Sequence, residues 1–574
     1  MLQVLAKAAL QSGLEAKDIR ELASLGSYGD HPGNCHRDLV RKVAPNLVAP
    51  ASYEIQIPMK ARNKDSGDME TMLRSHNVLL AVDWFSCYDA SGLATRVFGD
   101  ESSCATFWKN HSADDPKFFD NPYYTDAANK EGAVPLMLFG DGASHAEYDS
   151  VVGLGMRSLL TKEQITNSMF LLACLPKSAT AKNAGSDNDS WKEIWKVIVW
   201  DFTFLSIGVH PTVDHLGKAW PSNSERAKKA GQKLCPKSKL HGVIWVLAGD
   251  YEFMENEYGL KHHSSNTPCS WCACNKSDVP FNDFSASALW KDAIRTVAYH
   301  RSNPISKHLV LTIPGVVFEM FHLDVLHCLD LGISVHIFGN LFWDLCADQI
   351  PGTRQKALAD LNKDIVEFYR MLNIPSGKWI PYLSYNHFHP KNGQYPELKH
   401  VKAARVRAFS PVAVKLAEKY QTTDRHTRHR LQMCVLLDKM YQCVNQTAMR
   451  MDASTVEVFK KSIENLLAHY QYLANWSMNT PGKGIRYSVV TKHHYSAHFH
   501  EQAQFLAPRM FWTYPGESFM GLLGALCQAC SRGRSSHSMS AAVNLKFAMA
   551  KHLELAGIVS SDADWEIDEL NSDD

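Results

Sequence analysis

The chain has 574 residues, of which 45% are hydrophobic and 21% charged, and its 60 Lys and Arg are balanced by 60 Asp and Glu. This composition excludes an intrinsically disordered protein, and the length predicts two or more domains or one fold with a large insertion. The neutral balance excludes a cationic field over the whole molecule, so a polyanionic partner would have to be bound by local basic patches.

Targeting and membrane segments are not expected. The first residues, MLQVLAKAALQSGLEAKDIRE, lack a cationic start followed by a long apolar run, and acids occur from Glu15 onward. No segment has the roughly 18 uninterrupted apolar residues that a membrane helix requires. The 14 cysteines lack the spacing of a small disulfide scaffold, which predicts reduced thiols in the cytosol or nucleus.

Charge clusters locally in three basic runs and one acidic tail. The basic runs, candidates for contact with DNA, are residues 225–239, 399–407 and 425–430. Such runs more often form solvated surfaces than phosphate sites. The acidic tail, residues 561–574, is expected to be disordered.

The first part of the chain predicts a mostly helical lead-in region. Residues 1–75 are expected to form helices and loops, with a polar break at QIPMKARNKDSGDME that contains Pro58 and Gly67. Residues 76–130 alternate aromatic and turn residues irregularly, which is typical of a mixed region.

Four apolar runs then predict strands around one helix. Residues 134–142, 151–160 and 168–176 are expected to be strands, residues 191–208 have helical spacing, and the run from residue 242 to Gly249 is a fourth strand. The first strand is expected to end in a tight turn that presents Asp141 between two glycines. Asp250 follows the fourth strand directly. If the first and fourth strands are neighbours in a mixed sheet, these two carboxylates lie side by side at one edge.

A block of helices follows from about residue 340 to 485. Its apolar residues recur at three- and four-residue spacing in residues 357–372, 411–420, 429–446 and 454–476. After it, WTYPGESFMGLLGALCQACSRGR places Glu517 at the start of an apolar-striped helix. The expected regions are 1–130 (lead-in), 131–340 (first part of an α/β core), 341–485 (helical insertion), 486–550 (second part of the core) and 551–574 (acidic tail).

The three acids Asp141, Asp250 and Glu517 form the first candidate site. Two strand-end carboxylates and a third from a helix can bind a pair of divalent ions, which activate a water or hydroxyl and stabilise the leaving oxygen of a phosphodiester. Each acid also has a structural interpretation: a turn residue, a helix N-cap and a first-turn acid favoured by the helix dipole.

Cysteines and histidines form the second candidate site. Cys269 and Cys272 are a C-x-x-C pair, and His493 and His498 stand far later in KHHYSAHFH. Two thiolates and two imidazoles make a tetrahedral structural zinc site. Alternative ligands nearby are Cys274, His262, His263, His494 and His500, and the alternative to any metal site is reduced core cysteines with surface histidines.

Asp324 and His327 form a D-x-x-H motif in FHLDVLHCLDLG. It is a weak signal by itself, because a hydrogen-bonded pair at a helix start explains it equally well.

Taken in chain order, these motifs resemble the eukaryotic DDE transposases, whose catalytic core is RNase H-like. The group with a split Cys2His2 zinc site, to which the antigen-receptor V(D)J recombinase belongs, is most similar. GDYEFMENEYGLKHHSSNTPCSWC and WTYPGESFMGLL also resemble the corresponding stretches of CACTA-like transposases. The resemblance covers roughly residues 130–550.

The resemblance implies a fold and an activity. The fold would be an RNase H-like mixed sheet interrupted by an all-α insertion. Asp141, Asp250 and Glu517 would bind two Mg²⁺ or Mn²⁺ ions, and Cys269, Cys272, His493 and His498 would bind Zn²⁺. Such enzymes act in the nucleus on double-stranded DNA at the terminal inverted repeats of a transposon, where they hydrolyse one strand and transfer the 3′ end. Action at two ends implies a homodimer.

Two other functions remain open from the sequence. A domesticated, catalytically inactive derivative would keep the zinc-pinned fold for binding DNA or protein. A different RNase H-like nuclease would act on RNA.

Overall fold

The computed structural model describes residues 2–14, 16–31, 38, 49–63, 66–111, 114–164, 168–181, 189–389, 395–446, 449–531 and 538–555. The chain divides into two compact units. The first comprises residues 1–109, 126–243 and 517–574, and the second comprises residues 110–125 and 244–516. The acidic tail, residues 561–574, for which disorder is expected, lies outside the described residues.

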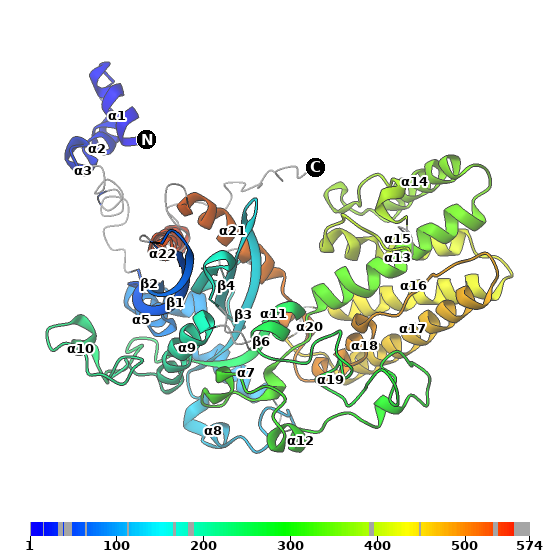
Figure 1. The fold of residues 1–574 in the computed structure, drawn as a ribbon, viewed down its shortest axis with the longest axis horizontal. Helices are drawn as coiled ribbons and strands as arrows, with labels where there is room; N and C mark the ends of the chain where they lie inside the picture. The colour runs from blue at the N-terminus through cyan, green and yellow to red at the C-terminus, as the bar shows by residue number, and fades with distance from the viewer. Residues whose placement is uncertain are drawn as a thin grey trace. The chain divides into compact units, whose positions relative to one another are not determined.

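The first unit begins with three helices and a β-hairpin (Figure 1). The helices are α1 (Leu2–Gln11), α2 (Lys17–Ala23) and α3 (Leu25–Tyr28), and the hairpin pairs β1 (Tyr53–Arg62) with β2 (Met69–Val78). The polar break expected at residues 56–70 is therefore wrong. Ile55, Ile57 and Met59 are buried in alternation with more exposed residues, which is the two-residue period of a strand.

A four-stranded sheet follows in the order β5–β4–β3–β6. Its strands are β3 (Ala133–Ala146), β4 (Asp149–Ser158), β5 (Phe170–Pro176) and β6 (His241–Gly249). β4 runs antiparallel to both β3 and β5. The four expected strands are thus confirmed, and the first and fourth of them are neighbours.

The first unit contains further helices after the hairpin (Figure 1). They are α5 (Ala81–Ser91), α6 (Ala94–Phe98), α7 (Glu101–Asn110), α9 (Asp189–Ile207), α10 (Glu225–Lys229), α21 (Tyr514–Ser531) and α22 (Ser540–Leu555). The rings of Trp84, Phe170 and Phe547 meet between α5, β5 and α22 with centroids 5.1 and 6.2 Å apart. Asp201 of α9 accepts the backbone N–H groups of Ala81 and Val82, so one helix caps the start of another.

The second unit is mostly helical. Its helices are α8 (Pro122–Thr125), α11 (Tyr251–Asn256), α12 (Val297–Ser302), a π-helical segment (Leu326–Ile333), α13 (Ser334–Asp344), a π-helical turn (Leu345–Gln349), α14 (Arg354–Met371), α15 (Ala403–Lys419), α16 (Arg425–Val444), α17 (Ala453–Asn479), α18 (Thr491–Ala497), α19 (Phe499–Ala503) and α20 (Pro508–Phe511). α13 to α17 form one helical block (Figure 1). The four helices expected in the insertion correspond to α14 to α17. No described helix is long and apolar enough to span a bilayer.

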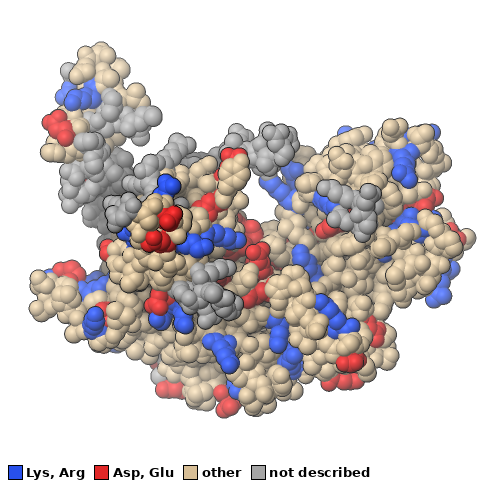
Figure 2. Space-filling model, viewed as in Figure 1, with Lys and Arg blue, Asp and Glu red and all other residues tan. Residues whose placement is uncertain are grey.

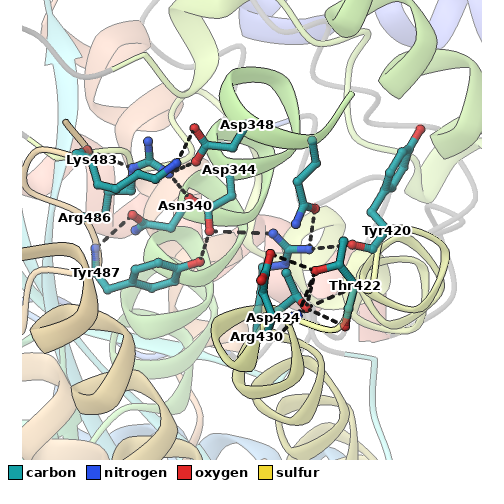
Figure 3. A network of polar contacts seen from close by, with 12 residues as sticks. Asn340, Asp344, Asp348, Tyr420, Thr422, Asp424, Arg430, Lys483, Arg486 and Tyr487 are labelled. Atoms are coloured by element: carbon teal, nitrogen blue, oxygen red, sulfur yellow. Dashed lines mark hydrogen bonds and ion pairs between the residues drawn. The ribbon is translucent and has the colours of Figure 1, made fainter. Parts of the chain in front are cut away.

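A buried ionic network holds this helical block together (Figure 3). Arg486 Nη1 lies 2.5 Å from both Asp344 Oδ1 and Asp348 Oδ2. The Tyr487 hydroxyl donates to Asp344 Oδ2, and Arg430 Nη1 lies 3.7 Å from the same oxygen. The network therefore joins α13, α16 and the segment after α17 through side chains that, apart from Asp348, are almost fully buried.

Basic and acidic side chains are interspersed over the face shown in Figure 2. This mixture is consistent with the equal numbers of positive and negative residues in the sequence.

Candidate functional site

A buried Cys2His2 cluster lies in the second unit. Cys269 and Cys272 come from the loop after α11, His494 from α18, and His498 caps the C-terminus of that helix. One ligand atom from each lies within 4.8 Å of the others. Cys272 Sγ is 3.2 Å from His494 Nε2, Cys269 Sγ is 3.5 Å from His498 Nε2, and the two Nε2 atoms are 3.3 Å apart.

One predicted ligand is wrong: His494 takes the place expected for His493. Residues four apart on an α-helix differ by about 40° around the axis, whereas residues five apart differ by about 140°. His494 and His498 therefore share a face and His493 does not. The His493 ring instead lies 4.2 Å from that of Tyr470, and its Nδ1 hydrogen-bonds to the backbone of Val490.

Neighbouring groups orient the four ligands. His494 Nδ1 is 2.9 Å from the carbonyl oxygen of Phe281, and His498 Nδ1 is 3.2 Å from Glu501 Oε1. Both contacts leave Nε2 directed at the cluster, as outer partners of metal-bound histidines do. The Trp271 backbone N–H donates to Cys269 Sγ at 3.3 Å. These partners fit a metal-binding role better than a chance meeting of core side chains.

Two pKa values in the cluster are shifted toward an ion pair between the Cys272 thiolate and the His498 imidazolium. A hydrogen bond from Cys269, with smaller contributions from the two histidines, lowers the pKa of Cys272 to about 6. Burial opposes charge on His498, but the charge of Glu501 and the hydrogen bond with Cys272 outweigh it and raise its pKa to about 10. Since metal binds thiolate and neutral imidazole, the shift at Cys272 favours binding, whereas His498 has to release its proton to the solvent when the ion binds.

The donor set fits a zinc ion with four protein ligands and no open position, which is typical of a structural site. Two thiols and two imidazole nitrogens at these separations match tetrahedral coordination. The ion would join residues 269–272 to residues 494–498, which lie on either side of the helical block in the sequence.

Asp250 begins α11, also in the second unit. Its Oδ1 accepts the backbone N–H of Phe253 at 2.6 Å, so the N-cap interpretation is confirmed. Burial raises the pKa of Asp250, although the nearby His327 opposes this shift. Both residues line a cavity of about 590 Å³, together with Glu255, Lys492 and other side chains.

The D-x-x-H motif forms a hydrogen-bonded pair beside this cavity. Asp324 Oδ2 is 2.6 Å from His327 Nδ1 and accepts the Thr513 hydroxyl at 2.7 Å. Burial alone would raise the pKa of Asp324, but the hydrogen bond and charge of His327 lower it overall. The carboxylate therefore fixes the orientation of an imidazole that lines the same cavity as Asp250.

Asp141 lies inside β3 of the first unit. The tight turn expected at this position is wrong, because β3 continues to Ala146 and Asp141 pairs with Gly153 of β4. Glycine marks turns, but it also marks strand positions where another element approaches closely. A Cβ at Gly153 would lie 2.4 Å from Leu523 Cδ2 and 3.1 Å from Met520 Sδ, both in α21.

Glu517 lies in the first turn of α21, as expected, one helical turn before Met520. Residues opposite each other in an antiparallel pair point to the same face of the sheet. Since α21 packs on the Gly153 side, the Asp141 side chain projects onto the face that α21 covers. A Cβ at Gly524 would lie 3.6 Å from the Cβ of Ala143, which faces the same way as Asp141.

The three acids are divided between the units. Asp141 and Glu517 belong to the first, and Asp250 belongs to the second. Their convergence around two metal ions stays a prediction.

Two partners of the Cys2His2 cluster were missed in the sequence. Glu501 follows His498 by three residues, a spacing that places it next to the imidazole and could have been recognised. The carbonyl of Phe281 carries no sequence signal.

No protein-family model matches the sequence, and no curated protein matches it significantly.

Proposed function

We propose that this protein is a DDE-type DNA transposase or a nuclease derived from one. In this proposal an RNase H-like core carries the helical insertion, and Asp141, Asp250 and Glu517 bind two Mg²⁺ or Mn²⁺ ions. The reaction is phosphodiester hydrolysis followed by strand transfer at transposon ends.

The observation that carries the proposal is that Asp141 and α21, which has Glu517 in its first turn, lie on the same face of the sheet. The long stretch of chain between β4 and α21 could have placed this helix on either face of the sheet. Packing of Met520 and Leu523 against Gly153 brings the helix onto the face to which Asp141 points. One carboxylate oxygen of Glu517 is itself buried.

The strand order supports the assignment of Asp250 to the same site as Asp141. β6 is the neighbour of β3, and Asp250 follows β6 directly. β3, β4 and β5 are antiparallel neighbours, and β6 lies on the other side of β3. This order supports the proposed RNase H-like core. In addition, His322 N donates to Leu247 O beside a parallel bridge between Leu247 and Phe321, which extends the β6 edge within the second unit.

The side chains have distinct tasks in this reaction. When bound, two divalent ions activate a water or 3′-hydroxyl and neutralise charge on the phosphodiester. The carboxylates of Asp141, Asp250 and Glu517 would supply the oxygen ligands that hard cations prefer. Burial, which raises the pKa of Asp250, makes a nearby cation the natural means of keeping this carboxylate ionised.

The remaining parts of the proposal concern partners and location. The Cys2His2 site would hold a structural zinc ion, double-stranded DNA with terminal inverted repeats would be the substrate, and two copies would act together in the nucleus. The three basic runs identified in the sequence would supply local phosphate contacts.

A nicking assay on supercoiled plasmid DNA with Mn²⁺ tests the proposal. Asp250→Asn should abolish nicking while DNA binding is retained, because Asn keeps the N-cap of α11 but lacks the charge that binds metal. Asp278→Asn, the same change at an exposed acid, is the control and should nick as the wild type does. Equal nicking by Asp250→Asn and wild type would contradict the catalytic assignment.

A non-catalytic derivative is the second candidate. The equal numbers of acidic and basic residues favour it, because phosphate neutralisation normally dominates the binding of DNA ends. In this case the wild-type protein would bind DNA or a protein partner without nicking in any divalent ion.

A further inference from the structure

A second group of potential metal ligands lies in the second unit, apart from the Cys2His2 cluster. It consists of Glu255 at the end of α11 and the consecutive histidines His262 and His263 in the following loop. One ligand atom from each lies within 4.8 Å of the others. None of the three belongs to the proposed acidic triad.

The contacts in this group are close and specific. His262 Nε2 is 3.2 Å from Glu255 Oε2, and His263 Nδ1 is 2.9 Å from Glu255 Oε1. The two imidazole rings are stacked with centroids 4.4 Å apart. Ligand atoms of one tetrahedral zinc ion stand about 3.3 Å apart, so small movements would suffice to admit an ion.

Burial is distributed unequally among the three side chains. Only 3% of the Glu255 side chain is exposed, compared with 52% for His262 and 57% for His263. A buried carboxylate requires a cationic or hydrogen-bonding partner. Two protonated imidazoles stacked on each other would repel, whereas two neutral imidazoles and one carboxylate complement a divalent cation.

Backbone and hydroxyl groups fix the geometry. The His263 backbone N–H donates to Glu255 Oε1 at 2.6 Å, which holds the carboxylate against the loop. The Ser264 hydroxyl lies 2.7 Å from His262 Nδ1 and so engages the nitrogen that faces away from Glu255. Such outer contacts set which ring nitrogen is available to a metal.

We propose that Glu255, His262 and His263 bind a divalent transition-metal ion of the zinc class. Two imidazoles and one carboxylate suit such an ion, whereas Mg²⁺ prefers oxygen ligands alone. Three protein ligands leave coordination positions open, in contrast to the closed Cys2His2 site. All three residues line the cavity of about 590 Å³ that Asp250 and His327 also line, so small ligands in it can reach the ion.

Counting bound metal in the full-length protein tests this site. Metal-stripped protein is titrated with Zn²⁺, and with Co²⁺ as a spectroscopic probe. With excess Mg²⁺ present to occupy the proposed acidic site, the wild type should bind two Zn²⁺ or Co²⁺ ions per chain, while Glu255→Gln and the double variant His262→Ala/His263→Ala should each bind one. Cys272→Ser should also bind one, and its Co²⁺ complex should lack the thiolate charge-transfer absorption that Glu255→Gln retains.

His389→Ala removes another exposed histidine and should still bind two ions. Circular dichroism checks the fold of every variant, and the double variant removes side chains that are mostly exposed, so it should remain folded. A wild type that binds a single ion, or a Glu255→Gln variant that binds two with unchanged affinity, would overturn the proposal. Neither result depends on whether the protein cleaves DNA.

Discussion

Adjacent histidines in KHHYSAHFH have opposite environments. His494 directs Nε2 to Cys272, while His493 packs against Tyr470. The sequence allowed both as zinc ligands, and only the helical phase of α18 distinguishes them.

This difference gives a prediction about zinc binding. His494→Ala should lose the zinc ion of the Cys2His2 site, because a tetrahedral site does not retain its affinity with a ligand missing. His493→Gln should retain it, although loss of a buried ring should lower stability. Co²⁺ titration with detection of thiolate charge transfer measures this site alone. Loss of that signal in His493→Gln but not in His494→Ala would contradict the assignment.

A second prediction concerns the buried Asp201, which caps α5. Burial raises its pKa from 3.8 to about 8, against two backbone hydrogen bonds that favour the charge. The folded state therefore binds a proton that the unfolded state releases between about pH 4 and 8. The stability that this bound proton contributes is fully present below the pKa of Asp201 in the unfolded chain. It is lost as the pH rises toward 8, the pKa in the folded protein, by at most about 1.4 kcal/mol per pH unit.

Asp201→Asn resembles the protonated carboxyl, so it should remove this pH dependence. Urea unfolding is measured from pH 5 to 8.5. The midpoint of the wild type should fall relative to that of the variant as the pH rises. A difference between variant and wild type that stays constant over this range would show that Asp201 does not titrate there.

Elements were predicted well where burial dictates a simple pattern. The strands β3 to β6 each contain a buried apolar run, and helices α14 to α17 show clear three- and four-residue spacing. The hairpin β1–β2 was missed because Pro58 and the polar residues near Gly67 suggested a break. Pro58 is tolerated there because β1 is an edge strand of a two-stranded sheet. The Pro58 carbonyl accepts the Ser190 hydroxyl, so this residue directs its backbone polar groups away from β2 and its lack of an N–H costs no bond between the strands.

The ionic network of the helical block gives a prediction at this scale. Asp344→Asn should destabilise the second unit by about 3–5 kcal/mol, because it leaves the buried Arg430 and Arg486 without their shared carboxylate. Glu457→Gln is the control: it breaks the exposed pair with Lys461 and should cost less than about 1 kcal/mol. Urea unfolding measures both, and similar losses in the two variants would contradict the importance of burial.

At the scale of the molecule, zinc should connect distant parts of the second unit. Cys272 and His494 are 222 residues apart, so an ion between them closes a long loop. Removal of zinc with a chelator should lower stability on the order of 4 kcal/mol and expose residues 273–493 to proteolysis, and added Zn²⁺ should reverse both. Cys272→Ser should behave as the chelated wild type does, without further response. A wild type that is equally protease-resistant with and without chelator would contradict this role.

The candidate site was predictable only in part. Residue types and spacing indicated the Cys2His2 set with one ligand displaced, and they indicated Asp141, Asp250 and Glu517 as acids at strand and helix ends. They could not indicate which face of the sheet α21 covers, because this depends on the contact of Met520 and Leu523 with a glycine far away in sequence. They also gave no reason to join Glu255 to His262 and His263.

Iron-mediated backbone cleavage tests the convergence of the three acids most directly. Fe²⁺ bound in place of Mg²⁺ generates hydroxyl radicals that cut the chain next to the ion, and the Glu255→Gln background removes the other proposed site for such an ion. We expect cuts near Asp141, Asp250 and Glu517 together, all suppressed by excess Mg²⁺ and by Asp250→Asn. Mg²⁺-sensitive cuts at only one of the three segments would contradict a shared two-metal site.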